Sequence, residues 1–545
     1  MTGLAEAFDR IGSFLEERLP LMHAAGAAVA VTDRDEILGV AVRGFADAAS
    51  GTPVRPDTRF QIGSISKSFA AIVAVQEAAA GRLDLHAPVS ELLPWVEIPQ
   101  PFGPITPHHL LTHTSGLPTG TEDAPGELAA VWNLREAIPG FAPGERFWYS
   151  NDAYKLLGLI LEHRTGQRIP ELIRERVLGP LGMRHTSPAI TNDVRTDLAT
   201  GYATMYDDRP PNREHPLVPA VWIVSDSADG SIVSSVVDMT AYARMLLSGG
   251  VPVLQPSGFD VLTTPASEGG DPDAPEFGYA YGLYVGLQDG RRRLFHTGGM
   301  IGFTALLMVD PDDGLGVVML LNGSGARRPT GRFALACVRR ALAGQDLPEV
   351  EHHDPAVVVN AADFAGTYAG EGRAFEVVAL DEQLLLREGE TEAALEPDAV
   401  EGDPPGDVFL ALHPALDRFR VSFGRDGAGR VAEAFHGADR LVREGAAAQP
   451  PPAQPPPEWH GFTGAYRSND PWYPFFRVVL RSGQLWMLAG AADEPELPLV
   501  PLGDGTFRVG RESWRPERIR FDRVVDGKTI RAVYDRGSWY RSFEE

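Results

Sequence analysis

A serine and a lysine three residues apart stand at the start of an apolar, alanine-rich helical stretch. Ser64 and Lys67 lie in QIGSISKSFAA, residues 61–71, and the apolar run continues to residue 80. Side chains three apart share one face of a helix, and the unpaired N–H groups of a first helical turn favour developing negative charge. Burial lowers the pKa of a lysine side chain, because desolvation disfavours the charged form. Lys67 can then accept the hydroxyl proton of Ser64 and make this serine a nucleophile.

The same two residues also have a purely structural interpretation. Ser64 can cap the helix, and Lys67 can bury its aliphatic stem while its ammonium group reaches water. A Ser-x-x-Lys pair occurs by chance in many chains of 545 residues. Further motifs are therefore needed to choose the catalytic interpretation.

A second segment supplies a tyrosine and an asparagine at a transition from loop to helix. FWYSNDAYKLLG contains Tyr149 and Asn151. A tyrosine hydroxyl can relay a proton to a leaving group, and an asparagine side chain can bind an amide carbonyl. We expect both residues beside Ser64.

A third segment, RRLFHTGGMIGF, has the pattern of a strand that runs into a pair of glycines. It contains His296, Thr297, Gly298 and Gly299. The edge of such a strand can hydrogen-bond substrate backbone through Thr297 and Gly298. The N–H groups of Ser64 and Gly299 can together hold an oxyanion.

The order Ser-x-x-Lys, Tyr-x-Asn, His-Thr-Gly resembles the penicillin-recognising serine hydrolases related to class C β-lactamases. The segments ITPHHLLTHTSGL (105–117), PGERFWYSND (143–152), LGPLGMRHTS (178–187) and GSIVSSVVDMTAYARMLLSGG (230–250) also look like that family. The resemblance covers roughly the first 345 residues. It implies a serine hydrolase that forms an acyl-enzyme, with Ser64, Lys67, Tyr149 and His296 as the catalytic set and no metal or organic cofactor.

The histidine at position 296 narrows the expected substrate. β-Lactamases of this type usually carry lysine there, whereas His-x-Gly looks more like D-Ala-D-Ala peptidases and D-aminopeptidases. The resemblance therefore favours a D-aminopeptidase-like enzyme acting on small amides or peptides that contain D-residues. A carboxylesterase or weak β-lactamase of the same fold is the alternative. A non-catalytic, penicillin-binding type of sensor is the alternative from another class, and the intact proton-transfer residues argue against it.

The elements around these motifs predict an α+β catalytic domain over residues 1–345. AAGAAVAVTDRDEILGVAVRGFAD and FTALLMVDPDDGLGVVMLLNGSG each read as two strands around a turn. Between these hairpins lie helical stretches that end at glycines, such as KSFAAIVAVQEAAAGRL, SNDAYKLLGLILEHRTG and VVDMTAYARMLLSGG. Strands at both ends predict an antiparallel sheet that is closed by the two ends of the domain and flanked by helices.

Residues after 345 contain an internal repeat at a constant offset of about 98 positions. FAGTY at 364–368 matches FTGAY at 462–466, RVSF at 420–423 matches RIRF at 518–521, and Gly429-Arg430 matches Gly527-Lys528. Short alternating runs with many turn residues are typical of β-barrels. We expect two small antiparallel β-barrels, at 346–445 and 458–545, joined by a proline-rich linker at 446–457. These barrels resemble the three-domain plan of bacterial D-aminopeptidase.

Composition limits the partners of the protein. The formal net charge is −25, which disfavours binding to nucleic acid and to anionic membranes. The first twenty residues carry four carboxylates and lack the apolar core of a signal peptide. We therefore expect a cytoplasmic protein with a small-molecule amide, peptide or ester as substrate, no nucleic-acid or membrane partner, and the oligomeric state, including a homodimer, left open. The single cysteine, Cys337, is expected to be a buried small hydrophobic residue.

For two other clusters of polar residues we prefer a structural interpretation to a functional one. His108, His109 and His113 have spacing that can suit a metal, but HExxH and a further ligand are missing and the family segment accounts for them better. Asp493, Glu494 and Glu496 form an acidic loop in the second barrel. This loop is expected to be solvated, with contact to a substrate ammonium group as the alternative.

Overall fold

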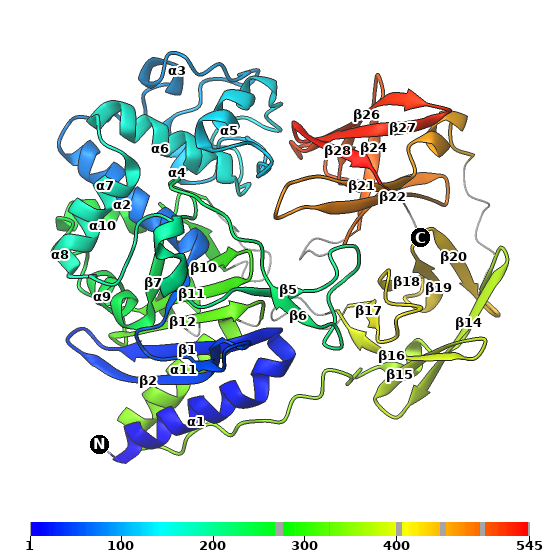
Figure 1. Cartoon of the computed structure of the whole chain (residues 1–545), viewed down its shortest axis with the longest axis horizontal. Coiled ribbons are helices and arrows are strands. Elements are labelled where there is room, and N and C mark those ends of the chain that lie inside the picture. Colours follow the sequence, from blue (N-terminus) through cyan, green and yellow to red (C-terminus); the bar gives the residue numbers. More distant parts are fainter. Residues whose placement is uncertain are drawn as a thin grey trace. The chain divides into compact units, whose positions relative to one another are not determined.

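The computed structural model describes residues 2–267, 276–288, 290–325, 327–398, 406–446, 454–490 and 496–542 (Figure 1). The chain forms two compact units. The first, called here the catalytic unit, comprises Met1–Gly120, Ala124–Ala203 and Leu217–His352. The second, the barrel unit, comprises Thr121–Asp123, Thr204–Pro216 and His353–Glu545.

The catalytic unit is built on an eight-stranded antiparallel sheet in the order β3-β2-β1-β12-β11-β10-β9-β8. Strand β1 from the start of the chain pairs with β12, with Val29 opposite Met319. The predicted sheet that is closed by the two ends of the domain is thus confirmed. Its strands are β1 (Ala24–Thr32), β2 (Ile37–Asp47), β3 (Thr52–Pro53), β8 (Phe277–Tyr279), β9 (Tyr284–Gln288), β10 (Arg291–Met300), β11 (Phe303–Asp310) and β12 (Leu315–Gly323). Two small sheets pair β4 (Arg59–Gln61) with β7 (Val233–Ser235), and β5 (Tyr202–Thr204) with β6 (Leu217–Pro219).

Helices cover both faces of this sheet, and the three predicted helices correspond to α2, α6 and α9. Among the described residues, no helix has the length and apolar character needed to cross a bilayer. The helices are α1 (Thr2–Arg18), α2 (Ser66–Ala79), α3 (Val89–Leu92), α4 (Pro107–Leu111), α5 (Glu127–Asn133), α6 (Asn151–Thr165), α7 (Ile169–Ile173), α8 (Gly179–Leu181), α9 (Val236–Leu247), α10 (Pro256–Thr263) and α11 (Arg327–Leu342).

The period-2 alternation of β1 divides the core into two layers. Ala27, Val29 and Val31 belong to the cluster that contains residues of α1 and α11. Ala28 and Ala30 belong to the larger cluster that contains residues of α2, α6 and α9. Burying a valine side chain contributes about 1.5–3 kcal/mol. The sheet is therefore held from both sides, and most residues of α2, the helix that follows Ser64, are buried in the larger layer.

Two closed antiparallel β-barrels of eight strands each form most of the barrel unit, as predicted. The first comprises β13 (Gly366–Gly370), β14 (Arg373–Leu380), β15 (Gln383–Glu388), β16 (Thr391–Pro397), β17 (Val408–Ala411), β18 (Val421–Arg425), β19 (Val431–His436) and β20 (Asp439–Arg443). The second comprises β21 (Gly464–Arg467), β22 (Phe475–Arg481), β23 (Gln484–Ala489), β24 (Leu497–Gly503), β25 (Thr506–Val509), β26 (Arg518–Val525), β27 (Lys528–Tyr534) and β28 (Gly537–Arg541).

The sequence repeat is a repeat of structure. Gly366 and Gly464 open the first strand of each barrel with φ of 150° and 146°, a conformation that a side chain would strain. The Tyr368 and Tyr466 hydroxyls each donate to the carbonyl oxygen four residues earlier at 2.7 Å. Equivalent residues therefore make equivalent local bonds in the two barrels.

In each barrel, an arginine of the last strand links that strand to the segment around the first strand and to the seventh strand. Arg443 and Arg541 lie 98 positions apart, and each guanidinium donates hydrogen bonds to backbone carbonyl oxygens near the first strand and in the seventh. We call each set a closing clasp. The acceptors are Asp363, Ala365 and Val431 in the first barrel, and Gly461, Thr463 and Thr529 in the second.

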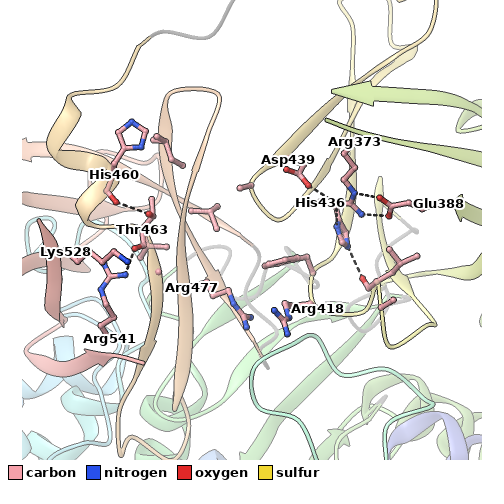
Figure 2. A pocket seen from close by; sticks show the side chains of 18 of the residues that line it. Arg373, Glu388, Arg418, His436, Asp439, His460, Thr463, Arg477, Lys528 and Arg541 are labelled. Atoms are coloured by element: carbon pink, nitrogen blue, oxygen red, sulfur yellow. Dashed lines mark hydrogen bonds and ion pairs between the residues drawn. The ribbon is translucent and has the colours of Figure 1, made fainter. Parts of the chain in front are cut away.

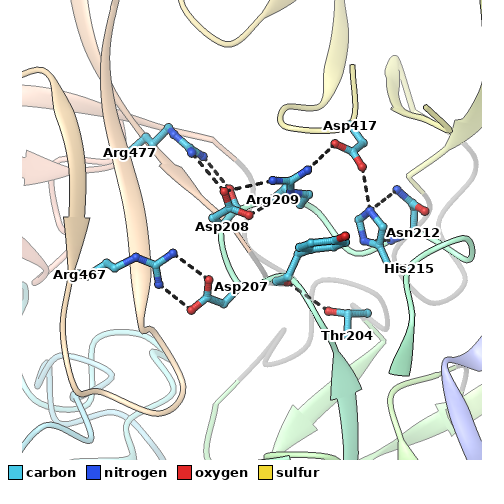
Figure 3. Close-up of polar contacts among 10 residues, drawn as sticks. Thr204, Asp207, Asp208, Arg209, Asn212, His215, Asp417, Arg467 and Arg477 are labelled. Carbon is cyan, nitrogen blue, oxygen red and sulfur yellow. Dashed lines mark hydrogen bonds and ion pairs between the residues drawn. The ribbon is translucent and has the colours of Figure 1, made fainter. Parts of the chain in front are cut away.

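The segment Thr204–Pro216, called here the anchoring segment, leaves the catalytic unit between β5 and β6 and groups with the barrels (Figure 3). Asp207 forms an ion pair with Arg467 at 2.7 Å in the second barrel. Arg209 forms one with Asp417 at 3.0 Å in the first barrel. The sequence prediction treats residues 1–345 as one continuous domain, whereas here a piece of that range packs with the barrels.

Two smaller predictions concern single residues. Cys337 is fully buried, as expected, and burial raises its thiol pKa to about 11. The acidic loop was expected to be solvated. Asp493 and Glu494 lie outside the described residues, but the Glu496 carboxylate accepts from Arg481 at 2.6 Å in an ion pair that is largely buried. Its charge is therefore neutralised within the barrel unit.

Candidate active site

Ser64 lies in the short 3-10 turn Gly63–Ile65, immediately before α2. Gly63 has φ of 52°, and a Cβ atom there would lie 2.5 Å from the carbonyl oxygen of Gly299. Only glycine permits both the left-handed backbone and this close approach. The glycine pair of β10 therefore lies against the turn that carries Ser64, as the predicted oxyanion hole of Ser64 and Gly299 requires.

Lys67 is fully buried and its amino group has three polar neighbours. Its Nζ lies 3.0 Å from Ser64 Oγ, 2.9 Å from Asn151 Oδ1 and 2.7 Å from the carbonyl oxygen of Asp229. The Nζ also lies 4.9 Å from the centroid of the Tyr149 ring. The alternative interpretation, in which the ammonium group of Lys67 reaches water, does not fit this burial.

The three neighbours of Lys67 suit both protonation forms of the amine. An ammonium group can donate to all three oxygens. A neutral amine can donate to the two carbonyl-type oxygens, of Asn151 and Asp229, and accept from the Ser64 hydroxyl. The proton of Ser64 can thus pass to Lys67 without any rearrangement of side chains. This is the arrangement needed for a general base.

Tyr149 completes the group around Ser64. Burial raises the pKa of the Tyr149 hydroxyl well above its ordinary value, and a hydrogen bond with the Ser64 side chain opposes this only in part. Tyr149 is therefore a phenol, not a phenolate, at neutral pH. A protonated hydroxyl beside the nucleophile can give its proton to a leaving group.

His113 positions the loop that carries Tyr149. Its Nδ1 accepts from the backbone N–H of Ser150 at 3.1 Å, and its carbonyl oxygen accepts from the N–H of Trp148 at 2.8 Å. The His113 ring centroid lies 4.2 Å from that of Tyr149. Sequence reasoning assigned His113 only to a family segment and a rejected metal cluster. The available signal was its place in HTSGL, but nothing in that pattern alone shows the contact.

His296 is buried on β10 and is electrically neutral. Its Nδ1 lies 2.5 Å from the Thr297 carbonyl oxygen, and its Nε2 lies 3.0 Å from the Tyr279 hydroxyl. A donor at Nδ1 and an acceptor at Nε2 satisfy both contacts. Burial, together with the positive charge of Lys67, lowers the His296 pKa to about 3. The ring centroids of His296 and Tyr149 are 6.4 Å apart, so His296 lines the group and a direct catalytic role stays a prediction.

The family model described as Beta-lactamase matches residues 18–339, which is more than half of the chain. The chain belongs to the Beta-lactamase family. The match ends before the barrels and contains each residue of the predicted site.

Relatives of this family include proteins with several described roles. Protein flp of Staphylococcus aureus is 26% identical over 332 residues, covering 58% of this chain and 63% of its own length. The chain thus spans less than two thirds of that relative. Esterase EstB of Burkholderia gladioli is 32% identical over 198 residues, covering 32% of this chain and 50% of its own.

Solved structures extend the likeness beyond the family match. The octameric penicillin-binding protein homologue from Pyrococcus abyssi covers 80% of this chain and 99% of its own at 25% identity, with a TM-score of 0.57. The D-amino acid amidase from Ochrobactrum anthropi, complexed with L-phenylalanine amide, covers 62% and 99% at 22% identity, with a TM-score of 0.52. The second likeness concerns the fold alone.

The edge of β10 beyond His296 fits the predicted substrate-binding strand. The ladder between β10 and β9 ends at Phe295 opposite Tyr284. Thr297 and Gly298 continue to pair with β11 on the other side. Their binding of substrate backbone stays a prediction. The same holds for Asn151, whose Oδ1 atom is already occupied by Lys67.

The two other histidines of the rejected metal cluster have structural roles. His108 Nδ1 lies 2.7 Å from the Tyr281 hydroxyl. His109 takes part in the capping box of α4 with Thr106. Hydrogen bonds therefore account for these residues, as they do for His113.

Proposed function

We propose that the protein is a serine hydrolase that forms an acyl-enzyme at Ser64 and acts on small amides or peptides containing D-residues. The observation that carries this proposal is the buried Lys67 amine at 3.0 Å from Ser64 Oγ, with acceptors for its remaining hydrogens. A buried amine beside a serine hydroxyl is suited to a proton-transfer role.

The proposed reaction uses groups that already touch one another. Ser64 Oγ attacks the carbonyl carbon of the substrate, its proton passes to Lys67, and the oxyanion is held by the N–H groups of Ser64 and Gly299. The C–N bond then breaks as a proton reaches the leaving nitrogen through Tyr149, leaving an ester on Ser64. Water hydrolyses that ester and restores the serine. Each oxyanion donor of this kind typically contributes about 3–4 kcal/mol.

His296 itself is neutral, but Arg327 donates to the Gly298 carbonyl oxygen at 3.5 Å and brings a guanidinium group to β10. With a pKa of about 3, His296 brings no positive charge to the strand at the pH values where hydrolases are usually assayed. A lysine at this position would attract a substrate carboxylate. His296 therefore adds no second cation to that of Arg327, and we propose small amides and peptides as the substrate class. The choice of D-residues rests on the likeness of His-Thr-Gly at 296–298 to the D-aminopeptidases of this family.

A carboxylesterase is the second candidate. Esterase EstB is the more similar of the two curated relatives over its matched region, at 32% identity. Esters have a better leaving group than amides and need less help from Tyr149. An esterase would thus lose much less activity than an amidase when Tyr149 becomes phenylalanine.

The deciding experiment compares D- and L-aminoacyl p-nitroanilides with p-nitrophenyl esters on the full chain. We expect hydrolysis of the D-aminoacyl anilides and a mass increase on Ser64 during turnover. Hydrolysis of esters alone, with no anilide cleaved, would select the carboxylesterase. A chain that forms no covalent adduct with any substrate or with a phosphonate would contradict both proposals.

The chain offers a matched serine control. Ser68 lies one turn beyond Ser64 on α2, where its hydroxyl donates to the Ile65 carbonyl oxygen and accepts from Tyr242. Ser64→Ala should abolish turnover and adduct formation, whereas Ser68→Ala should keep both. Labelling of Ser64→Ala at another serine would show that the nucleophile is assigned wrongly.

A further inference from the structure

A cavity of about 1000 Å³ lies between the two barrels, within the barrel unit (Figure 2). The first barrel contributes Leu416, Arg418 and Phe419 to its lining, and the second contributes Val479, Lys528 and Arg541. A volume of this size is typical of sites for small organic ligands. We call this space the interbarrel pocket.

The interiors of the two barrels are filled by their own side chains. Each barrel is filled by its own buried aromatic and aliphatic side chains, including Tyr368 and Phe409 in the first and Phe476 and Trp539 in the second. Small barrels that are packed in this way have no room for a guest. A ligand of this unit would therefore bind outside the barrels.

Several contacts fix the two walls of the interbarrel pocket relative to each other. The Arg481 guanidinium of the second barrel is buried and donates to the carbonyl oxygen of Gly437 in the first, at 2.8 Å from Nε. The anchoring segment also holds both barrels (Figure 3), since Asp208 pairs with both Arg209 and Arg477 and Arg209 pairs with Asp417. Contacts between the two barrels therefore define the shape of the interbarrel pocket.

Positive charge in the pocket is only partly compensated. Both lining carboxylates, Glu388 and Asp439, form ion pairs with the same arginine, Arg373 (Figure 2). Arg541 donates to the carbonyl oxygens of its closing clasp and to the Tyr466 hydroxyl, which are all neutral. Within the described residues, Lys528 has no ion pair and its side chain is exposed. The end of the pocket formed by the second barrel therefore keeps its cationic charge.

Comparison of the two repeats shows that, among the described residues, the unpaired cation is present in the second barrel and not at the equivalent position of the first. Arg430 is the counterpart of Lys528, 98 positions earlier, and forms an ion pair with Asp426 at 2.9 Å. The counterpart of Asp426 is Val524. The second barrel thus keeps the cation and replaces its carboxylate by an apolar residue. A cation without this internal partner is available to an external anion.

We propose that the interbarrel pocket binds an amphipathic organic anion, with a carboxylate or phosphate head and an apolar body. The head would lie near Lys528 and Arg541, where charge-assisted hydrogen bonds can form. The body would lie against the apolar wall that includes Leu416, Phe419 and Val479. This site is separate from the Ser64 chemistry and is proposed independently of it.

The test is calorimetric titration of the full chain with octanoate, octyl phosphate and octanol at low ionic strength. Before titration, Ser64 is blocked with a phosphonate so that the active site does not contribute. We expect the two anions to bind at least about tenfold more tightly than octanol. The stronger of the two anions then identifies the head group as carboxylate or phosphate.

A pair of variants on one hairpin locates the binding. Lys528→Glu places the opposite charge in the pocket and should weaken the better anion at least about tenfold. Arg523→Glu changes an exposed charge on β26 that does not line the pocket, and its affinity should stay within about twofold of the unsubstituted chain. Equal binding of octanol and the anions, equal effects of the two variants, or no anion binding up to solubility would each overturn the proposal.

Discussion

Two of the three lysines of the chain, Lys67 and Lys528, carry the same amino group in opposite surroundings. Lys67 is fully buried and has a partner for each hydrogen. Lys528 is exposed at the start of β27, with no ion pair among the described residues. A buried amine with a hydrogen-bond partner for each of its hydrogens is suited to proton exchange. Exposure beside a cavity suits one that only attracts charge.

The largest expected effect is the loss of the buried amine. Lys67→Ala should lower the acylation rate by about 10² to 10⁴, the usual loss for a general base. Tyr149→Phe should do the same for amide substrates, and the double variant should lose less than the product of the two, since both act on one proton path. Single-turnover kinetics measure these rates.

Lys528→Ala is the control for this first comparison. Its acylation rate should equal that of the unsubstituted chain. A near-normal rate in Lys67→Ala would contradict the proton-transfer role.

The closing clasps come next in size and compare the two barrels directly. Arg541→Ala and Arg443→Ala each leave several buried or partly buried carbonyl oxygens without a donor, at a cost of about 1–3 kcal/mol in the free energy of unfolding. Chemical denaturation should show similar losses for both, because the clasps are equivalent. If only one of the two substitutions lowered the free energy of unfolding, the two clasps would share a geometry but would not contribute equally to stability.

A smaller effect concerns pH and His296. Its pKa is about 3 in the folded chain and about 6.5 in an unfolded one. Between these values the unfolded chain binds the extra proton, so His296 contributes full stability above pH 6.5 and loses it as pH falls towards 3. His296→Gln should therefore flatten the decline of melting temperature between pH 7 and 4.

The reference for the His296 test is His460→Gln. His460 is an exposed histidine for which the structure offers no comparable burial. This variant controls for the exchange of a histidine for a glutamine at an exposed position. Identical slopes for His296→Gln and the unsubstituted chain would count against a buried neutral imidazole.

The smallest effect is expected at Lys528 itself. An amine-acetylating reagent should modify Lys528 well before Lys67 or Lys155, which are both buried. Acetylation there should leave hydrolysis unchanged and alter stability by less than about 0.5 kcal/mol. Peptide mass analysis gives the site, and bound octanoate should slow the modification. Early modification of Lys67 would show that its burial is not maintained in solution.

Sequence patterns predicted the parts of this protein that depend on local rules. Alternating and helical periodicity gave the β1–β12 pairing, the main helices and both barrels. Gly429 and Gly527, which match at the constant offset of the repeat, both adopt positive φ. The residues that meet around Ser64 were found through motif order, because residue types and their order follow from the chemistry that they perform.

Other features depend on contacts between distant residues and could not be read in this way. The Asp229 carbonyl that accepts from Lys67 is a backbone atom, which any residue supplies. The contact of His113 with the Tyr149 loop joins segments more than thirty positions apart. The neutralisation of Glu496 by Arg481 depends on which way two side chains turn within one barrel. Composition carries no record of such pairings.

The anchoring segment makes the chain less modular than its order of domains suggests. Residues 204–216 are covalently a loop of the catalytic unit, yet their ion pairs are made with the barrels. A gene fragment that ends at residue 352 would encode that loop without Arg467 and Asp417. If relatives exchanged both barrels by recombination, the anchoring segment would have to be exchanged with the barrels. If only the second barrel were exchanged, at the proline-rich linker, the new barrel would need a cation that can pair with Asp207.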